Sequence, residues 1–183
     1  MEKPKNQRAS RKEWLLAATD VLNRDGVDKI KVVSIARELN LTSGSFYWHF
    51  RDVQDLLQGV LDHWENALTA NIIDDAQAFT GEPKQRILNL MCQVIREDAA
   101  RTDAAIKVWS RRSPTVEAAF SRVIASRFSF AKWMFEEAGF SESEAAIRGR
   151  MMVAVLMGEA LAGIAKQEGW EDIIRDEWSI LTN

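Results

Sequence analysis

The stretch around Asn40-Leu41 constrains the fold more than any other part of this 183-residue chain. Apolar residues at helical spacing predict one short helix over residues 33–39 and a second over residues 42–49. Asn40 lies between them, and asparagine tolerates the left-handed backbone conformation that a tight turn requires. Two short helices joined in this way are typical of a helix-turn-helix, whose second helix can enter the major groove of double-stranded DNA.

The residues of this stretch divide into an inner and an outer set. The inner set is apolar and can pack on a neighbouring helix: Ile35, Ala36, Leu41, Phe46 and Phe50. The outer set begins with small groups and bare backbone amides that suit phosphate, and Thr42 is also expected to cap the second helix with its side chain: Thr42, Ser43, Gly44 and Ser45. Tyr47, Trp48 and His49 then offer a hydroxyl, an indole and an imidazole on consecutive positions.

Capping and stop signals predict helices along the rest of the chain as well. Ser10 and Ser141 each precede a glutamate by three residues, which is the pattern of a capping box. Only three prolines and nine glycines interrupt the sequence, and no strand pattern occurs. The prediction is an all-α fold of about nine helices, with a three-helix head and a C-terminal helical bundle. The further helices are expected over residues 10–25, 52 to the late 70s, 83–100, 103–111, 113–138, 141–167 and 171–181.

Charge is distributed unequally between the two ends of the sequence. Residues 1–51 contain ten Lys and Arg against six Asp and Glu, although the whole chain has a net charge of −3. A basic head on an acidic body is typical of a DNA-binding protein. The expected domains are therefore a DNA-binding domain over 1–51, with a basic arm at 1–9, and a second domain over 52–183.

The chain resembles the tetracycline-repressor (TetR) family over roughly residues 10–60. The resemblance is carried by Leu15-Leu16-Ala17-Ala18 with Asp25-Gly26, by Ile35-Ala36-Arg37-Glu38-Leu39, and by the run from Leu41 to Phe50. It implies a DNA-binding transcriptional regulator, usually a ligand-responsive repressor, that binds a palindromic operator as a homodimer. The DNA-contacting residues that the resemblance and the outer face together imply are Val33, Ser34, Thr42, Ser43, Gly44, Ser45, Tyr47, Trp48, His49 and Arg51.

Three positions depart from the family pattern. Val32 stands where many members have a capping threonine, and Asn40 replaces the usual glycine. Val53 stands where many members have a lysine or arginine that binds phosphate, and Arg51 is the expected substitute.

Residues of the second domain are assigned by resemblance to a small-molecule effector site and a dimer interface. The expected effector pocket comprises Trp64, Met91, Cys92, Ile95, Trp109 and Phe128. The helix near Met151–Ala165 is apolar on nearly every side, so it is either a buried core helix or a partner-binding helix. The expected dimer residues are Met152, Val155, Leu156, Glu159, Ala162 and Gly163, in a four-helix bundle completed by residues 114–138 or by the last helix.

Other interpretations remain open at several positions. The basic arm is either a DNA contact or a solvated tail, and Tyr47, Trp48 and His49 could instead join an aromatic core. The single cysteine, Cys92, excludes an internal disulfide and is interpreted as a buried structural thiol in preference to a redox or metal site. His63 is interpreted as a surface histidine, or one with its hydrogen bonds satisfied, in preference to a ligand contact.

No metal site or nucleophile–base pair is recognisable, so the chain is expected not to be an enzyme and to need no cofactor. No stretch is long enough for a signal peptide or a membrane span, which predicts a cytoplasmic protein. The rival hypothesis is a helical enzyme or protein-interaction module with a vestigial head.

Overall fold

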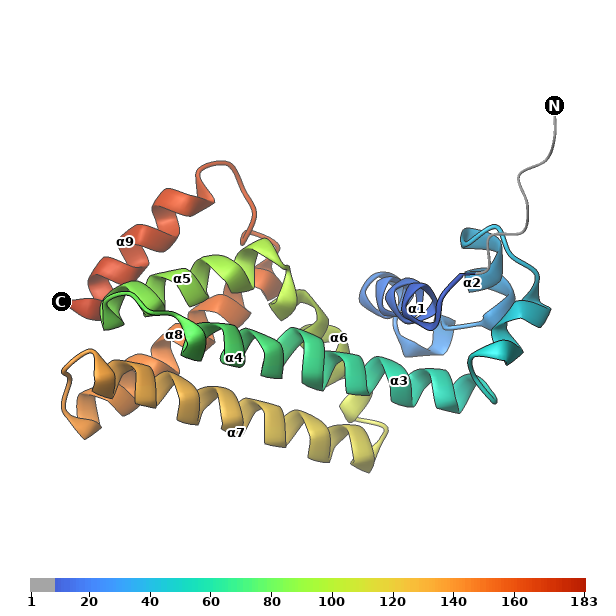
Figure 1. Ribbon diagram of the computed structural model, residues 1–183, viewed down its shortest axis with the longest axis horizontal. Helices are drawn as coiled ribbons and strands as arrows, with labels where there is room; N and C mark the ends of the chain where they lie inside the picture. The colour runs from blue at the N-terminus through green and yellow to red at the C-terminus, as the bar shows by residue number, and fades with distance from the viewer. Residues whose placement is uncertain (1–8) are drawn as a thin grey trace. The chain divides into compact units, whose positions relative to one another are not determined.

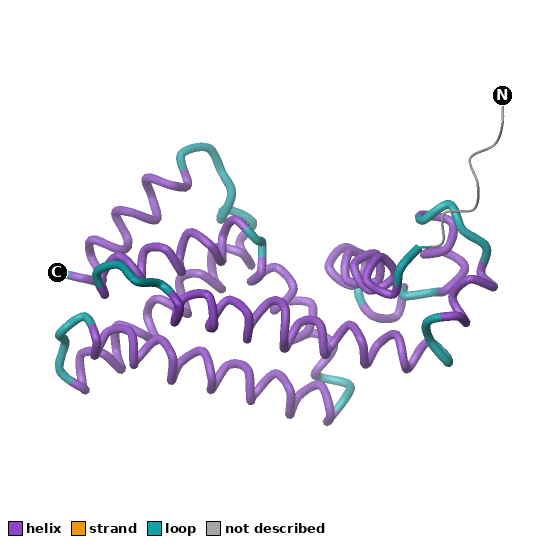
Figure 2. The backbone as a smooth tube through the Cα atoms, viewed as in Figure 1, coloured by secondary structure: helices purple, strands orange, loops and turns teal. Residues whose placement is uncertain are grey.

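A computed structural model describes residues 9–183, so the basic arm lies almost wholly outside the described residues. Within that range the chain is built of helices and loops with no strand, which confirms the all-α prediction (Figure 2). No helix there is long and apolar enough to cross a membrane. The contacts divide the chain into two compact units, the first ending at Trp64 and the second running from Glu65 to Asn183. The expected functional boundary between residues 51 and 52 stays a prediction.

Helix α1 (Arg11–Asp25) opens the first unit, which we call the head. Its capping box is formed as predicted: the Glu13 amide donates to Ser10 Oγ at 3.3 Å, and the Ser10 amide donates to the Glu13 carboxylate at 2.7 Å. Gly26 ends the helix with a φ of 86° and donates its amide to the Leu22 carbonyl at 3.0 Å. A short 3-10 helix, η1 (Val27–Lys29), leads to α2 (Val32–Glu38).

The turn after α2 has the geometry that the sequence predicts. Asn40 adopts a left-handed φ of 56°, and its amide donates to the Arg37 carbonyl. The Leu41 amide reaches back to the Ala36 carbonyl at 2.8 Å, which completes a Schellman closure. These two hydrogen bonds satisfy carbonyl groups in the last turn of α2 and set the direction in which the chain leaves the helix.

The segment predicted as an α-helix over 42–49 is instead a 3-10 helix, η2 (Ser43–Trp48). Thr42 makes no side-chain cap, so that prediction is wrong. Its carbonyl accepts two bonds from Ser45, one from the amide at 3.0 Å and one from the hydroxyl at 2.7 Å. These i→i+3 bonds tighten the first turn into 3-10 geometry. Helix α3 (Val53–Glu65) follows, and its Asp55 amide donates to the Asp52 carboxylate at 2.9 Å, as expected of an N-cap.

Aromatic rings hold the head together. Phe46 is fully buried, with its ring centroid 5.3 Å from Trp14 on α1 and 5.3 Å from Phe50. Gly59 lies where α3 approaches α1, and a Cβ there would lie 2.8 Å from Leu15 Cδ2, the end of a flexible side chain. The rings fix the orientation of η2 on the head.

The second unit, which we call the body, continues from α3 without a loop through a π-helix. The sequence predicts one long helix over this region, but residues 66–70 widen to π geometry. The remaining elements are η3 (Asn66–Ala70), α4 (Asn71–Ala78), α5 (Pro83–Arg96), α6 (Ala99–Ser110), α7 (Pro114–Glu137), α8 (Glu142–Ala162) and α9 (Trp170–Thr182).

Helices α7 and α8 make the most extensive pairing within the body (Figure 1). Gly149 permits their close approach, because a Cβ there would lie 2.9 Å from the backbone nitrogen of Lys132. Helix α9 packs beside α5 and is tied to it by the Trp178 indole, which donates to the Lys84 carbonyl at 2.7 Å. The Ser141 side chain caps α8 as predicted, and the Ser113 side chain caps α7.

Two helix ends differ from the predicted boundaries. Helix α5 ends at Arg96 rather than near residue 100, because Asp98 adopts a left-handed φ of 55°. Helix α8 ends at Ala162 rather than near residue 167. Gly163 is left-handed there, and the Ile164 amide donates to the Glu159 carbonyl at 3.0 Å.

Candidate nucleic-acid interface and ligand cavity

Three large side chains of the predicted DNA contacts stand out from the head. Trp48 is 74% exposed, Tyr47 is 66% exposed and Val33 is 60% exposed. They belong to η2 and to the first turn of α2, and their neighbours Phe46 and Ile35 are fully buried. The aromatic-core interpretation therefore holds for Phe46 and not for Tyr47 or Trp48. Exposed aromatic groups on a rigid support are typical of a binding surface.

The small polar residues form the start of η2. Thr42 and Gly44 are exposed, while Ser43 and Ser45 are half-buried. A Cβ at Gly44 would have only the Thr42 hydroxyl within 4 Å, so the backbone is open to solvent at this point. A surface of this kind permits close approach of a nucleic-acid backbone.

His49 and Arg51 lie at the other end of η2. His49 is half-buried, and its amide donates to the Phe46 carbonyl at 2.9 Å. The Arg51 side chain is 88% exposed and its Nε lies 3.6 Å from Asp55, a solvated pair that binds weakly. The Arg51 amide, more than its side chain, holds the pKa of the Asp55 carboxyl below its usual value. The Arg51 guanidinium is therefore available to another anion.

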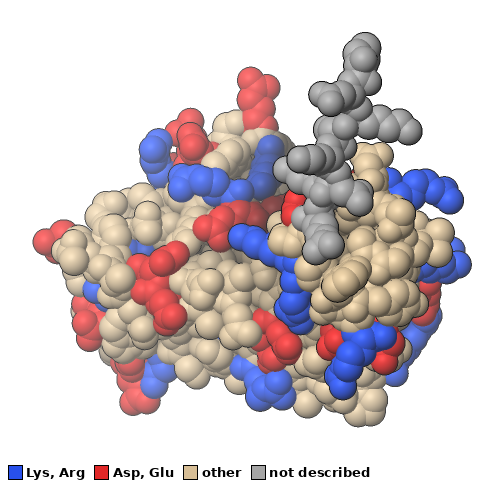
Figure 3. Space-filling model, turned by 45° about the vertical axis from the view of Figure 1, so that its right-hand side comes forward, with Lys and Arg blue, Asp and Glu red and all other residues tan. Residues whose placement is uncertain are grey.

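A basic groove on the head was missed in the sequence. It is lined by four cations and the Ser34 side chain, with two carboxylates: Val21, Arg24, Asp25, Lys29, Lys31, Ser34, Arg37 and Glu38. Arg24 pairs with both carboxylates, at 2.8 Å to Asp25 and 3.1 Å to Glu38. Lys29, Lys31 and Arg37 are exposed, and basic side chains stand out from the head surface in Figure 3. The signal in the sequence was the group of basic residues before and within α2: Lys29, Lys31 and Arg37.

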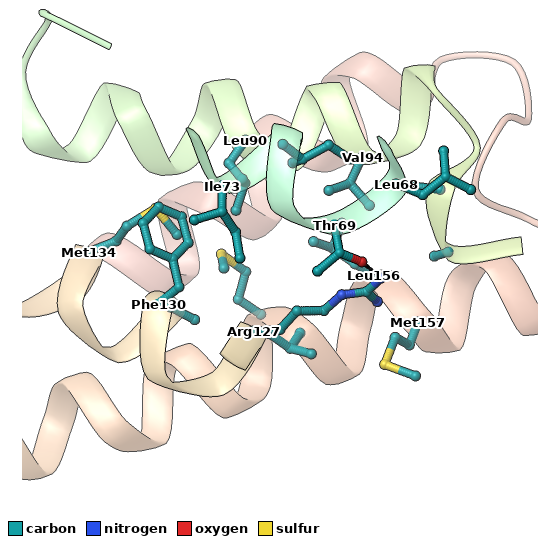
Figure 4. A pocket seen from close by; sticks show the side chains of 16 residues that line it. Leu68, Thr69, Ile73, Leu90, Val94, Arg127, Phe130, Met134, Leu156 and Met157 are labelled. Atoms are coloured by element: carbon teal, nitrogen blue, oxygen red, sulfur yellow. Dashed lines mark hydrogen bonds between the residues drawn. The ribbon is translucent and has the colours of Figure 1, made fainter. Parts of the chain in front are cut away.

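The body contains an apolar cavity between α4, α5, α6, α7 and α8. Its open volume is about 60 Å³, room for a few water molecules. The lining residues are Leu68, Thr69, Ile72, Ile73, Leu90, Val94, Ala99, Ala100, Arg127, Phe130, Ala131, Met134, Met152, Val153, Leu156 and Met157 (Figure 4).

None of the six residues expected in an effector pocket lines this cavity. Met91 and Ile95 are buried in the core, and the cavity-facing residues of α5 are their neighbours Leu90 and Val94. Sequence periodicity identifies the apolar side of α5 but not which part of that side meets a void. The other four, Trp64, Cys92, Trp109 and Phe128, also lie off the lining.

One charged side chain reaches the cavity wall. The Arg127 guanidinium binds both carboxylate oxygens of Asp103, at 2.5 and 3.1 Å, and donates to Thr69 Oγ1 at 2.8 Å. The Asp103 side chain is only 1% exposed. Arg127 thus connects α6, α7 and η3. The signal in the sequence was an arginine on the apolar side of α7, between Val123 and Phe130.

The residues expected at a dimer interface divide by burial. Met152 and Leu156 are buried inside the body, so they face its core and not its surface. Val155 and Glu159 are half-buried, while Ala162 and Gly163 are exposed at and beyond the end of α8. The exposed large apolar residues of α8 are Ile147, Met151 and Leu161, and those of α9 are Ile173 and Ile180. Burial, and to a lesser degree the nearby Glu159 carboxylate, raises the pKa of Glu177 on α9.

No group of three or more His, Cys, Asp and Glu in the described part of the chain is placed to hold a metal ion. Cys92 is half-buried, and burial raises the pKa of its thiol. Burial, and to a lesser degree Lys12, lowers the pKa of His63. The interpretations of both residues stay predictions.

Comparison with known proteins adds a family match to this geometry. Residues 15–60 match the family "Bacterial regulatory proteins, tetR family". The HTH-type transcriptional regulator AcrR of Shigella flexneri is 24% identical over 86 residues, which is 47% of this chain and 40% of AcrR. The chain thus matches about two fifths of the length of this curated relative.

Solved structures share the fold over nearly the whole chain. A TetR transcriptional regulator from Legionella pneumophila matches with a TM-score of 0.76 at 14% identity. The match covers 96% of this chain and 97% of the Legionella chain. A regulator from Saccharomonospora viridis, solved in complex with choline, has a TM-score of 0.73 at 14% identity and covers 93% of each chain.

The exposed helix-turn-helix on an all-helical chain is the arrangement found in DNA-binding transcriptional regulators. The head thus resembles that of the tetR family of bacterial regulatory proteins over residues 15–60, and the chain shares the fold of solved transcriptional regulators.

Proposed function

We propose that this protein binds the major groove of a palindromic operator as a homodimer, and that a small molecule in the body cavity modulates this binding. Repression is the expected regulatory outcome, and the cytoplasm is the expected compartment. The protein acts by binding and not by catalysis.

The observation that carries the proposal is the outward face of η2. Tyr47 and Trp48 are exposed beside the open backbone of Gly44, and the buried ring of Phe46 fixes them in place. Lys29, Lys31 and Arg37 supply positive charge on the same unit. Phosphate contacts would position the head, and Trp48 would meet base edges or thymine methyl groups.

Ligand control is supported by the body cavity and by one structural relative. The cavity is almost wholly apolar, with one arginine and one threonine on its wall. The S. viridis regulator of the same fold holds choline. A ligand can change DNA binding only if it prefers one of two arrangements of the protein.

Homodimer formation is supported by the exposed apolar residues of α8. Ile147, Met151 and Leu161 recur at spacings of four and ten residues, so they share a side of the helix. Two-fold symmetry would also present two heads to the two halves of a palindrome. The interface would therefore use this exposed side of α8, with α9, in place of Met152 and Leu156.

Two valines of equal exposure allow a matched test. Val33 on α2 and Val108 on α6 are each 60% exposed. Val33→Glu would place a negative charge against phosphate, so we expect at least a tenfold loss of affinity for DNA from upstream of the protein's own coding sequence. Val108→Glu should leave that affinity unchanged.

Fluorescence anisotropy at several salt concentrations measures both variants against wild type. Equal affinities for all three proteins would contradict the placement of the DNA-binding surface. Absence of salt-sensitive, sequence-preferring binding by wild type would contradict the regulator itself and favour a protein-interaction module.

A further inference from the structure

We infer that the body cavity selects an uncharged, largely apolar molecule with one hydrogen-bond acceptor. This acceptor receives the hydrogen bond that Arg127 otherwise donates to Thr69. This inference rests on the proposed function, in which the cavity is the effector site. It specifies the chemical class of the effector and the contact that recognises it.

The cavity wall favours an apolar ligand. Thr69 and Arg127 are the two polar residues of its lining, and the rest are aliphatic, aromatic or methionine side chains. Met134, Met152 and Met157 are unbranched at Cβ and can change rotamer, so they can move apart to admit a molecule larger than the present opening. Figure 4 shows the Arg127 guanidinium beside Thr69 among these apolar groups.

The charge balance at Arg127 disfavours ionic ligands. Asp103 neutralises the guanidinium through two bonds, and its carboxylate lies behind the wall and not on it. An organic cation entering the cavity would therefore meet Arg127 first and would gain no carboxylate partner. An organic anion would lose its hydration to reach an arginine whose charge is already balanced. An uncharged acceptor avoids both penalties.

The bond to Thr69 is the one that a ligand can replace. It joins Arg127 to a neutral hydroxyl, whereas the bonds to Asp103 are charge-assisted at both ends and stronger. A threonine within a helix can turn its hydroxyl to a carbonyl one turn earlier, so Thr69 need not lose its hydrogen bonding. Since Thr69 belongs to η3, the exchange acts directly on the π-helical segment.

Four aromatic compounds of similar size test the ligand class on the full-length protein. Acetophenone carries one acceptor, and α-methylstyrene replaces its oxygen with a methylene group. Benzoate and benzylammonium supply the two charges. We expect acetophenone to bind wild type more tightly than either ion, as measured by titration calorimetry.

Thr69→Val removes the competing acceptor with little change in shape. Affinity for acetophenone should rise about threefold to tenfold, the value of one net hydrogen bond, while affinity for α-methylstyrene stays unchanged. Thr182→Val is the matched control, because Thr182 is equally buried in the body but lies on α9 away from the cavity. It should change neither affinity.

Tighter binding of either ion, equal effects of Thr69→Val on both uncharged compounds, or no binding of acetophenone would overturn the inference. DNA affinity of the same wild-type preparation is measured separately. If the protein is not a DNA-binding regulator, it will fail to bind DNA in that measurement, while its ligand preferences will be unaffected.

Discussion

Adjacent residues of η2 perform opposite tasks. Phe46 is fully buried against Trp14, while Tyr47, the next residue, is 66% exposed. Edge-to-face packing of the Phe46 and Tyr47 rings, at 5.2 Å, couples the two. The buried ring restricts the exposed one, so the binding group loses little conformational freedom when it meets DNA.

Tyr47 and His49 are expected to contact phosphate and not bases. The double variant Tyr47→Phe with His49→Ala should weaken binding to every sequence by about tenfold, because it removes hydrogen bonds to phosphate that read no base. Binding titrations with the operator and with unrelated duplexes measure the loss for each sequence. Trp48→Ala provides the contrast, since it should change which sequences are preferred. Unchanged affinity of the double variant, or a loss confined to one sequence, would refute the phosphate role.

Single residues could be predicted from sequence where local chemistry decides their conformation. The left-handed Asn40 and the capping serines Ser10 and Ser141 were predicted because each depends on a few neighbouring residues. The Thr42 cap was predicted wrongly, because the Ser45 amide, from which its side chain would accept, donates to the Thr42 carbonyl instead. The cavity lining depends on packing between five helices, which no local pattern encodes.

At the scale of elements, helix starts are well determined by the sequence and helix interiors less so. The π-helix η3 follows no local signal in residues 66–70. Its Thr69 side chain instead binds Arg127, which is 58 positions away in the sequence. Local sequence patterns do not encode long-range hydrogen bonds of this kind, and the predicted single helix is divided into three segments, α3, η3 and α4.

Two glycines of α8 provide a matched pair for testing the packing of α7 and α8. A Cβ at Gly149 would lie 2.9 Å from the Lys132 backbone nitrogen, whereas a Cβ at Gly158 meets nothing within 4 Å. Gly149→Ala should therefore destabilise the body by about 1–3 kcal/mol. Gly158→Ala should stabilise it by about 0.5–1 kcal/mol, because alanine favours the helix. Urea unfolding measures both, and equal changes would contradict the close approach.

At the scale of the whole molecule, the proposed dimer depends on the exposed side of α8. Leu161 is 75% exposed there. Leu161→Glu should raise the dimer dissociation constant by at least about a hundredfold, because a carboxylate buried in an apolar interface lacks a partner. Sedimentation velocity over a range of concentrations measures this, with Val108→Glu as the control. A monomeric wild type, or a variant that stays dimeric, would place the interface elsewhere.

Hydroxyl-radical footprinting of the DNA upstream of the protein's own coding sequence tests DNA recognition by the head most directly. We expect two protected half-sites of matching sequence, on one face of the duplex and separated by about one helical turn or a multiple of it. Protection should disappear with Val33→Glu and persist with Val108→Glu. Uniform cleavage with wild-type protein, or protection unaffected by Val33→Glu, would contradict operator recognition by the head.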